Sequence, residues 1–104
     1  MCIRDRKKIR GIDCVFSVAG DYAAIGFMLE AMAHGYRVPS DFALLGFDDV
    51  EMSSAVSPAL STIRQPIAKM GTEAVKILNN YFKNKKRGVE HIVLKSSFVS
   101  RKTA

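Results

Sequence analysis

One short run, residues 42–50, constrains the fold of this chain more than any other segment. Four consecutive apolar residues begin it at Phe42, and such a run is typical of a strand buried on both faces of a parallel sheet. Gly46 then lets the backbone bend or another group come close. Asp48 and Asp49 follow where the strand ends, which is where ligands bind in an open parallel sheet. We expect polar groups directed at a small molecule here, although the two carboxylates could equally cap the next turn or helix.

The residues before this run complete a strand–helix–strand unit. Cys14–Val18 is short, apolar and rich in strand formers, which predicts a buried strand and a buried, inert thiol at Cys14. Asp21 is a candidate N-cap for a helix over 22–34, because its carboxylate can accept from the free backbone donors of a helix start. Gly35 supplies a left-handed stop. The length of this unit suits two parallel strands joined by a right-handed crossover.

The alternation of strands and helices continues in the second half. Residues 50–58 could form a short helix or a loop, whereas Leu60–Gln65 alternates apolar and polar residues as a strand or an extended crossing segment does. Pro66 suits the first helical position. Lys83–Gly88 predicts a basic loop, and His91–Val99 predicts a final strand. The clearest amphipathic helix lies between Pro66 and this loop, with an apolar stripe of Ile67, Met70, Ala74, Ile77, Leu78, Tyr81 and Phe82.

This order of elements predicts an α/β fold, a parallel sheet with helices on both faces. A chain of 104 residues is about half of a usual doubly wound domain. Residues 1–6, MCIRDR, look like the translated end of a sequencing adapter, so we assign only residues 7–104 to the fold.

The composition is that of a globular protein with a formal net charge of +6. Much of the positive charge gathers near the N-terminus and in the 83–88 loop, without interleaved aromatic residues that could stack on bases, so we favour solvated loop charge over a nucleic-acid surface. No apolar run approaches the roughly 20 residues needed to cross a bilayer. The charged N-terminus lacks a secretory signal, and neither cysteine has a metal or redox spacing. These features favour the cytoplasm.

The sequence predicts neither an enzyme nor a metal or cofactor site. Asp48 and Asp49 would point to opposite sides of an extended backbone, so they make a poor acid–base pair. His34 and His91 lack a neighbouring carboxylate or cysteine pattern, and the glycine spacing fits no phosphate-binding fingerprint.

Four segments resemble the C-terminal part of the effector-binding region of the LacI/GalR family. They are FSVAGDYAAIG at 16–26, VPSDFALLGFDD at 38–49, PALSTIRQPIAKMG at 58–71 and LKSSFVSRKT at 94–103. The resemblance spans nearly all of residues 13–103. It implies a partial periplasmic-binding-protein-like (type I) fold, in which an effector lies between two α/β lobes joined by three crossing strands. On this basis the chain lacks the N-terminal lobe core and the DNA-binding headpiece.

The same resemblance implies how the chain divides between the lobes. Residues 13–59 would belong to the C-terminal lobe. Residues 60–104 would supply a crossing strand, then a helix and a final strand that pack partly on the N-terminal lobe.

The resemblance also implies a ligand-binding site. The aspartate that matches Asp48 reaches the effector, and a carboxylate suits sugar hydroxyls or the N–H groups of a base. Many members carry asparagine where this chain has Gly20, so one hydrogen bond is absent here or is replaced by backbone or water. The effector is therefore a small sugar or a purine-like molecule. Asp21 and Gln65 are further candidate contacts.

The family forms dimers through the helix that matches 22–32. Tyr22, Ile25 and Met28 are the candidate contacts here, and the alternative for Ile25 and Met28 is a place in the lobe core. The implied function is effector sensing in a cytoplasmic, repressor-type transcription regulator, which contacts DNA only through its headpiece and has no membrane partner. The alternative is a periplasmic sugar-binding protein of a transport system.

We expect the isolated chain to be marginally stable or prone to aggregation, because its amphipathic helix would lack the sheet that it covers. A thermal melt followed by circular dichroism tests this expectation. A cooperative melt of the monomer at high temperature would contradict it.

Overall fold

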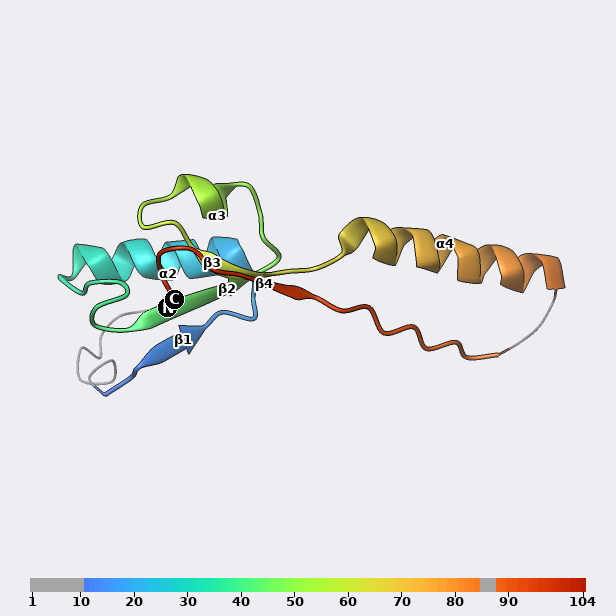
Figure 1. The fold of residues 1–104 in the computed structure, drawn as a ribbon, viewed down its shortest axis with the longest axis horizontal. Coiled ribbons are helices and arrows are strands. Elements are labelled where there is room, and N and C mark those ends of the chain that lie inside the picture. The colour runs from blue at the N-terminus through green and yellow to red at the C-terminus, as the bar shows by residue number, and fades with distance from the viewer. Residues whose placement is uncertain (1–10, 85–87) are drawn as a thin grey trace. The chain divides into compact units, whose positions relative to one another are not determined.

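The computed structural model describes residues 11–84 and 88–104 (Figure 1). In chain order the elements are β1 (Cys14–Phe16), α2 (Asp21–Ala33), β2 (Ala43–Phe47), α3 (Met52–Ala55), β3 (Ser61–Arg64), α4 (Ile67–Asn84) and β4 (Ser97–Val99). The chain divides into two compact units. The first contains the residues up to Arg64 together with Phe98–Ala104, and the second is Gln65–Ser97.

The four strands form one sheet in the order β1-β2-β3-β4. β1 runs parallel to β2 with Val15 opposite Leu44, and β2 runs parallel to β3 with Gly46 opposite Thr62. The predicted α/β class with a parallel sheet is therefore confirmed. Because β1, β2 and β3 are parallel, their carboxyl ends lie at the same edge of the sheet.

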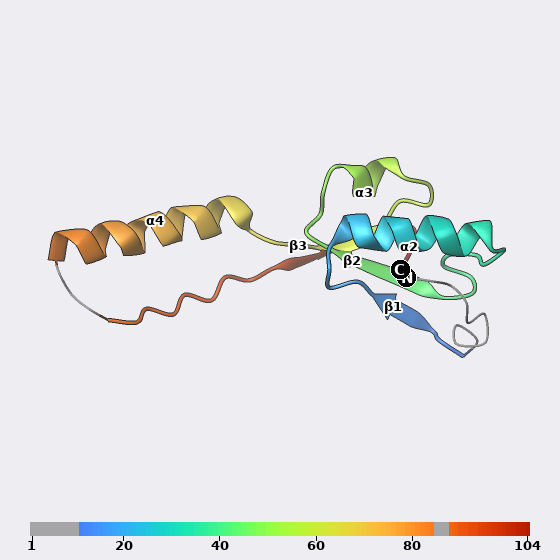
Figure 2. The same ribbon diagram turned by 180° about the vertical axis from the view of Figure 1, so that it is seen from behind.

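Helix α2 packs on one face of the sheet and runs along β2, as the view from behind also shows (Figure 2). Its inward residues meet Phe42, which directly precedes β2, and Leu44 within β2, and both of these side chains are fully buried. The ring of Phe42 packs edge-on against Phe27 and Tyr36, with centroid distances of 5.6 and 6.4 Å. The buried core consists of Ala24, Ile25, Met28, Ala31, Phe42, Leu44 and Leu60.

The crossover helix matches its prediction closely, but its start does not. α2 begins at Asp21 rather than at residue 22, Gly20 is the N-cap, and no side chain caps the helix. The prediction that Asp21 caps α2 is therefore wrong. The physical reason is that Asp21 is 1% exposed and its carboxylate is held by distant partners described below. At the other end, Gly35 has the expected positive φ of 86°.

Three other local predictions need correction. β1 is an edge strand whose Cys14 is exposed, so the thiol is not buried. α4 continues through Lys83 and Asn84, and residues 85–87 of the predicted loop, like residues 1–6, lie outside the described residues. The predicted strand 91–99 is reduced to Ser97–Val99, because a strand needs a partner for its backbone hydrogen bonds as well as an apolar sequence.

The second unit is dominated by α4, the longest helix of the described residues. It is strongly amphipathic as predicted, yet none of its residues is buried. Phe82 is 74% exposed and Val75 is 65% exposed. Neither α4 nor any other described helix combines the length and apolar character needed to span a bilayer.

The C-terminal residues are built into the sheet of the first unit. The Thr103 hydroxyl accepts a hydrogen bond from the Ser61 N–H (2.8 Å) and donates one to the Leu44 carbonyl (2.7 Å). The Leu44 N–H in turn donates to the Thr103 carbonyl at 2.8 Å. Thr103 thus bridges β2 and β3 immediately before their paired register begins at Leu45 and Ser61.

A second tight contact joins the sheet to α2. Gly46 lies so close to Asp21 and Leu60 that a Cβ atom at this position would overlap Asp21 Oδ1 and would lie 2.9 Å from Leu60 Cδ2. The absence of a side chain at Gly46 therefore leaves the space that the buried carboxylate occupies.

We predict that Thr103→Val destabilises the protein by about 2–4 kcal/mol, because it leaves a buried N–H and a buried carbonyl without partners. Thr103→Ser keeps the hydroxyl and should cost only about 1 kcal/mol for the lost methyl group. Chemical denaturation of the complete protein that contains this chain measures both effects. Equal stability of the Val and Ser variants would contradict the bridging role.

We predict that Gly46→Ala costs about 3 kcal/mol, since the new methyl group must displace Asp21 or Leu60. Gly26→Ala is the matched control. A Cβ there meets nothing within 4 Å, and in the interior of α2 it should stabilise by about 0.5–1 kcal/mol. Thermal unfolding compares the two variants, and a harmless Gly46→Ala would mean that the close approach can relax.

Candidate ligand-binding site at the carboxyl ends of the strands

Asp48 lies directly after the carboxyl end of β2, as the sequence predicted. The structure places Gly20, which follows β1, beside it: a Cβ at Gly20 would lie 3.1 Å from Asp48 Oδ2. Gly20 also has a φ of 103°, a conformation that side chains rarely tolerate. A residue larger than glycine would therefore be strained by its backbone and would press on the Asp48 carboxylate.

The turn that carries Asp48 has an unusual backbone. Asp48 and Asp49 both have positive φ, 105° and 57°, and such residues cluster at ligand sites because the surrounding structure must hold them there. The Asp48 N–H donates to the Ile63 carbonyl of β3 at 2.9 Å. The Val50 N–H donates to Asp21 Oδ2, also at 2.9 Å. Backbone contacts on both sides of Asp49 thus fix the turn.

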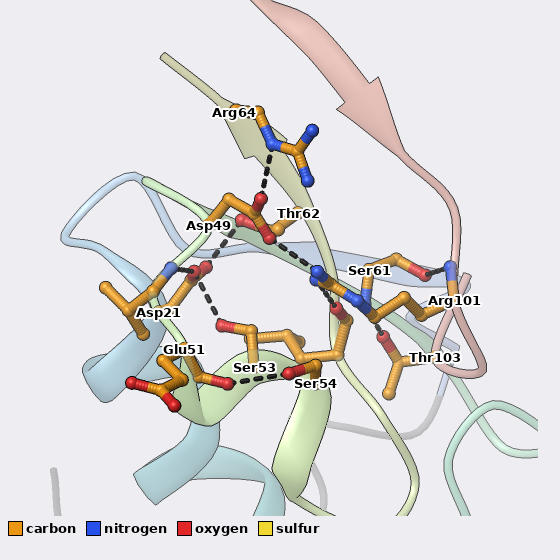
Figure 3. A network of polar contacts seen from close by, with 12 residues as sticks. Asp21, Asp49, Glu51, Ser53, Ser54, Ser61, Thr62, Arg64, Arg101 and Thr103 are labelled. Carbon is orange, nitrogen blue, oxygen red and sulfur yellow. Dashed lines mark hydrogen bonds and ion pairs between the residues drawn. The ribbon is translucent and has the colours of Figure 1, made fainter. Parts of the chain in front are cut away.

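The Asp49 carboxylate is paired with two arginines from distant parts of the chain (Figure 3). Its Oδ2 accepts from Arg64 Nε at 2.5 Å, and its Oδ1 accepts from Arg101 Nη2 at 2.6 Å. The Asp49 side chain is only 9% exposed. Burial raises its pKa, but the hydrogen bonds and charges of Arg101 and Arg64 outweigh burial and lower the pKa below its usual value. The stabilisation from this pairing is therefore present above the ordinary aspartate pKa and is lost as pH falls through the lowered value.

Arg101 is held by more than the ion pair. Its Nη1 donates to the Leu60 carbonyl at 2.8 Å, and its backbone N–H donates to Ser61 Oγ at 2.9 Å. Its side chain is 17% exposed, compared with 58% for Arg64. The two ion pairs of Asp49, which we call its two arms, thus differ in burial. The Arg101 arm is the better fixed, because Arg101 makes further hydrogen bonds to Leu60 and Ser61.

Asp21 faces the interior. Its Oδ1 accepts from Thr62 Oγ1 at 2.6 Å, and its Oδ2 accepts from Ser53 Oγ at 2.7 Å as well as from the Val50 N–H (Figure 3). Both oxygens of this candidate ligand contact are therefore engaged with protein donors. The carboxylate links α2 to α3, β3 and the turn after β2.

The other candidate residues are distributed over the chain. Gln65 is the first residue of the second unit and is half-buried, and its carbonyl accepts from the Ile67 N–H at 2.9 Å. Ile25 and Met28, predicted as dimer contacts with the lobe core as the alternative, lie in the core of the first unit. Tyr22 is 70% exposed on α2.

Sequence reasoning missed the partners of the two buried carboxylates. Arg101 stands 52 positions from Asp49, and Thr62 stands 41 positions from Asp21. The available signal was general: an aspartate beside a buried strand requires donors.

One cavity and one absence also bear on which ligands the described residues could bind. A cavity of about 430 Å³ between α2 and the sheet has a mostly apolar lining that includes Val15, Phe27 and Leu44. It does not include Asp48. Among the described residues, no group of three histidine, cysteine or acidic side chains is placed to hold a metal ion.

Comparison with known proteins gives a consistent assignment. Residues 13–104 match the model of the periplasmic binding protein-like domain. The ribose operon repressor of Bacillus subtilis (strain 168) is 35% identical over 85 residues, which are 82% of this chain and 26% of the repressor. The HTH-type transcriptional repressor PurR of Vibrio campbellii is 32% identical over 80% of this chain and 25% of its own length. The chain thus spans about a quarter of the length of these relatives.

Solved structures agree in fold. The transcriptional regulator CelR in its cellobiose complex superimposes with a TM-score of 0.82 and 26% identity, over 88% of this chain and 28% of that chain. A LacI family regulator from Enterococcus faecalis V583 with bound ribose gives a TM-score of 0.78 and 26% identity, over 88% and 34%. The chain therefore belongs to the periplasmic binding protein-like family, in the branch that contains the LacI/GalR transcription regulators.

Proposed function

We propose that this chain is the C-terminal part of the effector-binding domain of a bacterial transcription repressor. The observation that carries the proposal is the Asp48 turn, in which a partly exposed carboxylate stands beyond the carboxyl end of a parallel strand on a strained, firmly held backbone. Its relatives are repressors, and its structural neighbours are regulators, some of them with bound sugars. On this basis the chain senses a ligand and is not an enzyme.

The effector is a small polyol or a base with N–H groups. Asp48 provides acceptor oxygens for vicinal hydroxyls or ring N–H groups. Gly20 provides space and no side-chain donor, so the backbone and water complete the contacts at that side. The relatives named for ribose and the structure with bound ribose make ribose the first ligand to test, and PurR relatives make a purine base the second.

The two compact units suggest how the chain serves a two-lobed domain. We assign the first unit to the C-terminal lobe and α4 to a surface of the N-terminal lobe. Apolar side chains along an unburied α4 would be covered there. The complete protein would act in the cytoplasm as a homodimer and contact DNA through a separate headpiece. Tyr22, being exposed, is the predicted α2 residue that remains available for a dimer contact.

Substitution of Asp48 tests the proposed site. We predict that Asp48→Asn in the complete regulator weakens binding of ribose at least tenfold, because the charged acceptor is lost. If the effector is a purine base, the same loss is expected for that base. Operator binding without effector should stay within about twofold. Isothermal titration and gel-shift assays measure the two quantities.

Asp41→Asn is the matched control. Asp41 is exposed and pairs with Arg37 on the surface at 2.8 Å, so its loss should change neither quantity. An Asp48→Asn variant with unchanged effector affinity would remove Asp48 from the site. Ligand binding by a wild-type protein that has no operator activity would instead favour a transport function.

A further inference from the structure

The Asp49 pairing has a special position in the chain. Arg64 immediately precedes Gln65, where the chain enters the second unit, and Arg101 follows Ser97, where the chain leaves it. One carboxylate therefore binds the segment that leads out of the first unit and the segment that leads back into it. Among the described residues, no other ion pair joins these two segments.

The pairing is also adjacent to the candidate effector contact. Asp48 and Asp49 are consecutive, both with positive φ, so the Asp49 carboxylate is attached to the same turn that carries Asp48. The Asp48 N–H is bound to Ile63, the residue before Arg64. The turn and the outgoing segment are thus connected twice, once by backbone and once by side chain.

The two arms suit different tasks. Arg101 is 17% exposed and is fixed to Leu60 and Ser61, so it anchors Asp49 to the sheet. Arg64 is 58% exposed and its pairing is more open to solvent. An exposed arm can release and re-form at small cost, whereas a buried charge pair resists separation.

We propose that Asp49 is a positioning residue that couples the Asp48 turn to both connections between the units. Arg101 serves as the fixed anchor and Arg64 as the releasable arm. This inference rests on the proposed function for its role in effector response. The mechanical part, that Asp49 restrains both connections, stands without it.

Amide hydrogen exchange on the complete protein without effector tests the mechanical part. Asp49→Asn should raise exchange at least tenfold in peptides covering 61–66 and 97–103, because the two guanidinium groups lose their charged partner. The matched control is Asp41→Asn, which removes the carboxylate of the other described Arg–Asp pair of the first unit and should leave both peptides unchanged. Unchanged exchange in Asp49→Asn would overturn the proposal.

Ribose response tests the coupling. Arg64→Gln should keep ribose affinity within about twofold but reduce the ribose-induced change in operator affinity at least fivefold, and Arg64→Lys should restore part of it. The double variant Asp49→Asn with Arg64→Gln should respond no worse than Asp49→Asn alone, since both remove the same link. Additive losses, or a full response in Arg64→Gln, would overturn the coupling role.

The two proposals can fail separately. If wild-type protein ignores ribose while Asp49→Asn loosens both connections, the proposed effector is wrong and the restraint by Asp49 holds. If Asp48→Asn abolishes ribose binding while Asp49→Asn leaves hydrogen exchange unchanged, the effector site holds and the restraint is wrong.

Discussion

The structure depends on the buried carboxylate of Asp21. Burying the side chain of Asp21 is costly unless each oxygen has hydrogen-bond donors, and the chain supplies them from Val50, Ser53 and Thr62. These donors stand 29, 32 and 41 positions from Asp21 in the sequence. The hydroxyl groups of Ser53 and Thr62 point toward its carboxylate (Figure 3). Satisfying one charge thereby fixes the start of α2 against α3, β3 and the turn beyond β2.

The proposed ligand site is built on this arrangement. Asp21 holds Val50, Ile63 holds the N–H of Asp48, and the arginines hold Asp49. Asp48, Asp49 and Val50 are neighbours in one turn, and each is therefore held by contacts of its own. A backbone with two successive positive φ values would relax without such contacts, so the interior network supports the turn that carries the partly exposed Asp48.

Sequence patterns predicted the parts of this molecule that depend on local chemistry. The apolar runs predicted β1 and β2, and the periodic stripe predicted α4. The Asp48 position followed from the rule that parallel strands present ligand sites at their carboxyl ends. The role of Asp21 did not follow, because an N-cap and a first helical residue look alike in sequence, and the donors that distinguish them lie far along the chain at Val50, Ser53 and Thr62. β4 was overestimated for a related reason: hydrophobicity indicates where a strand could form, while its extent depends on a neighbouring strand.

The space left by Gly46 limits how this protein can change over time. A side chain there would overlap Asp21 and crowd Leu60, and removal of Asp21 first would leave its three donors without an acceptor. Neither order of replacement offers a neutral intermediate, and Leu60 would still crowd a side chain at Gly46 after Asp21 was gone. Library designs that randomise either position alone should therefore mostly recover the starting residue.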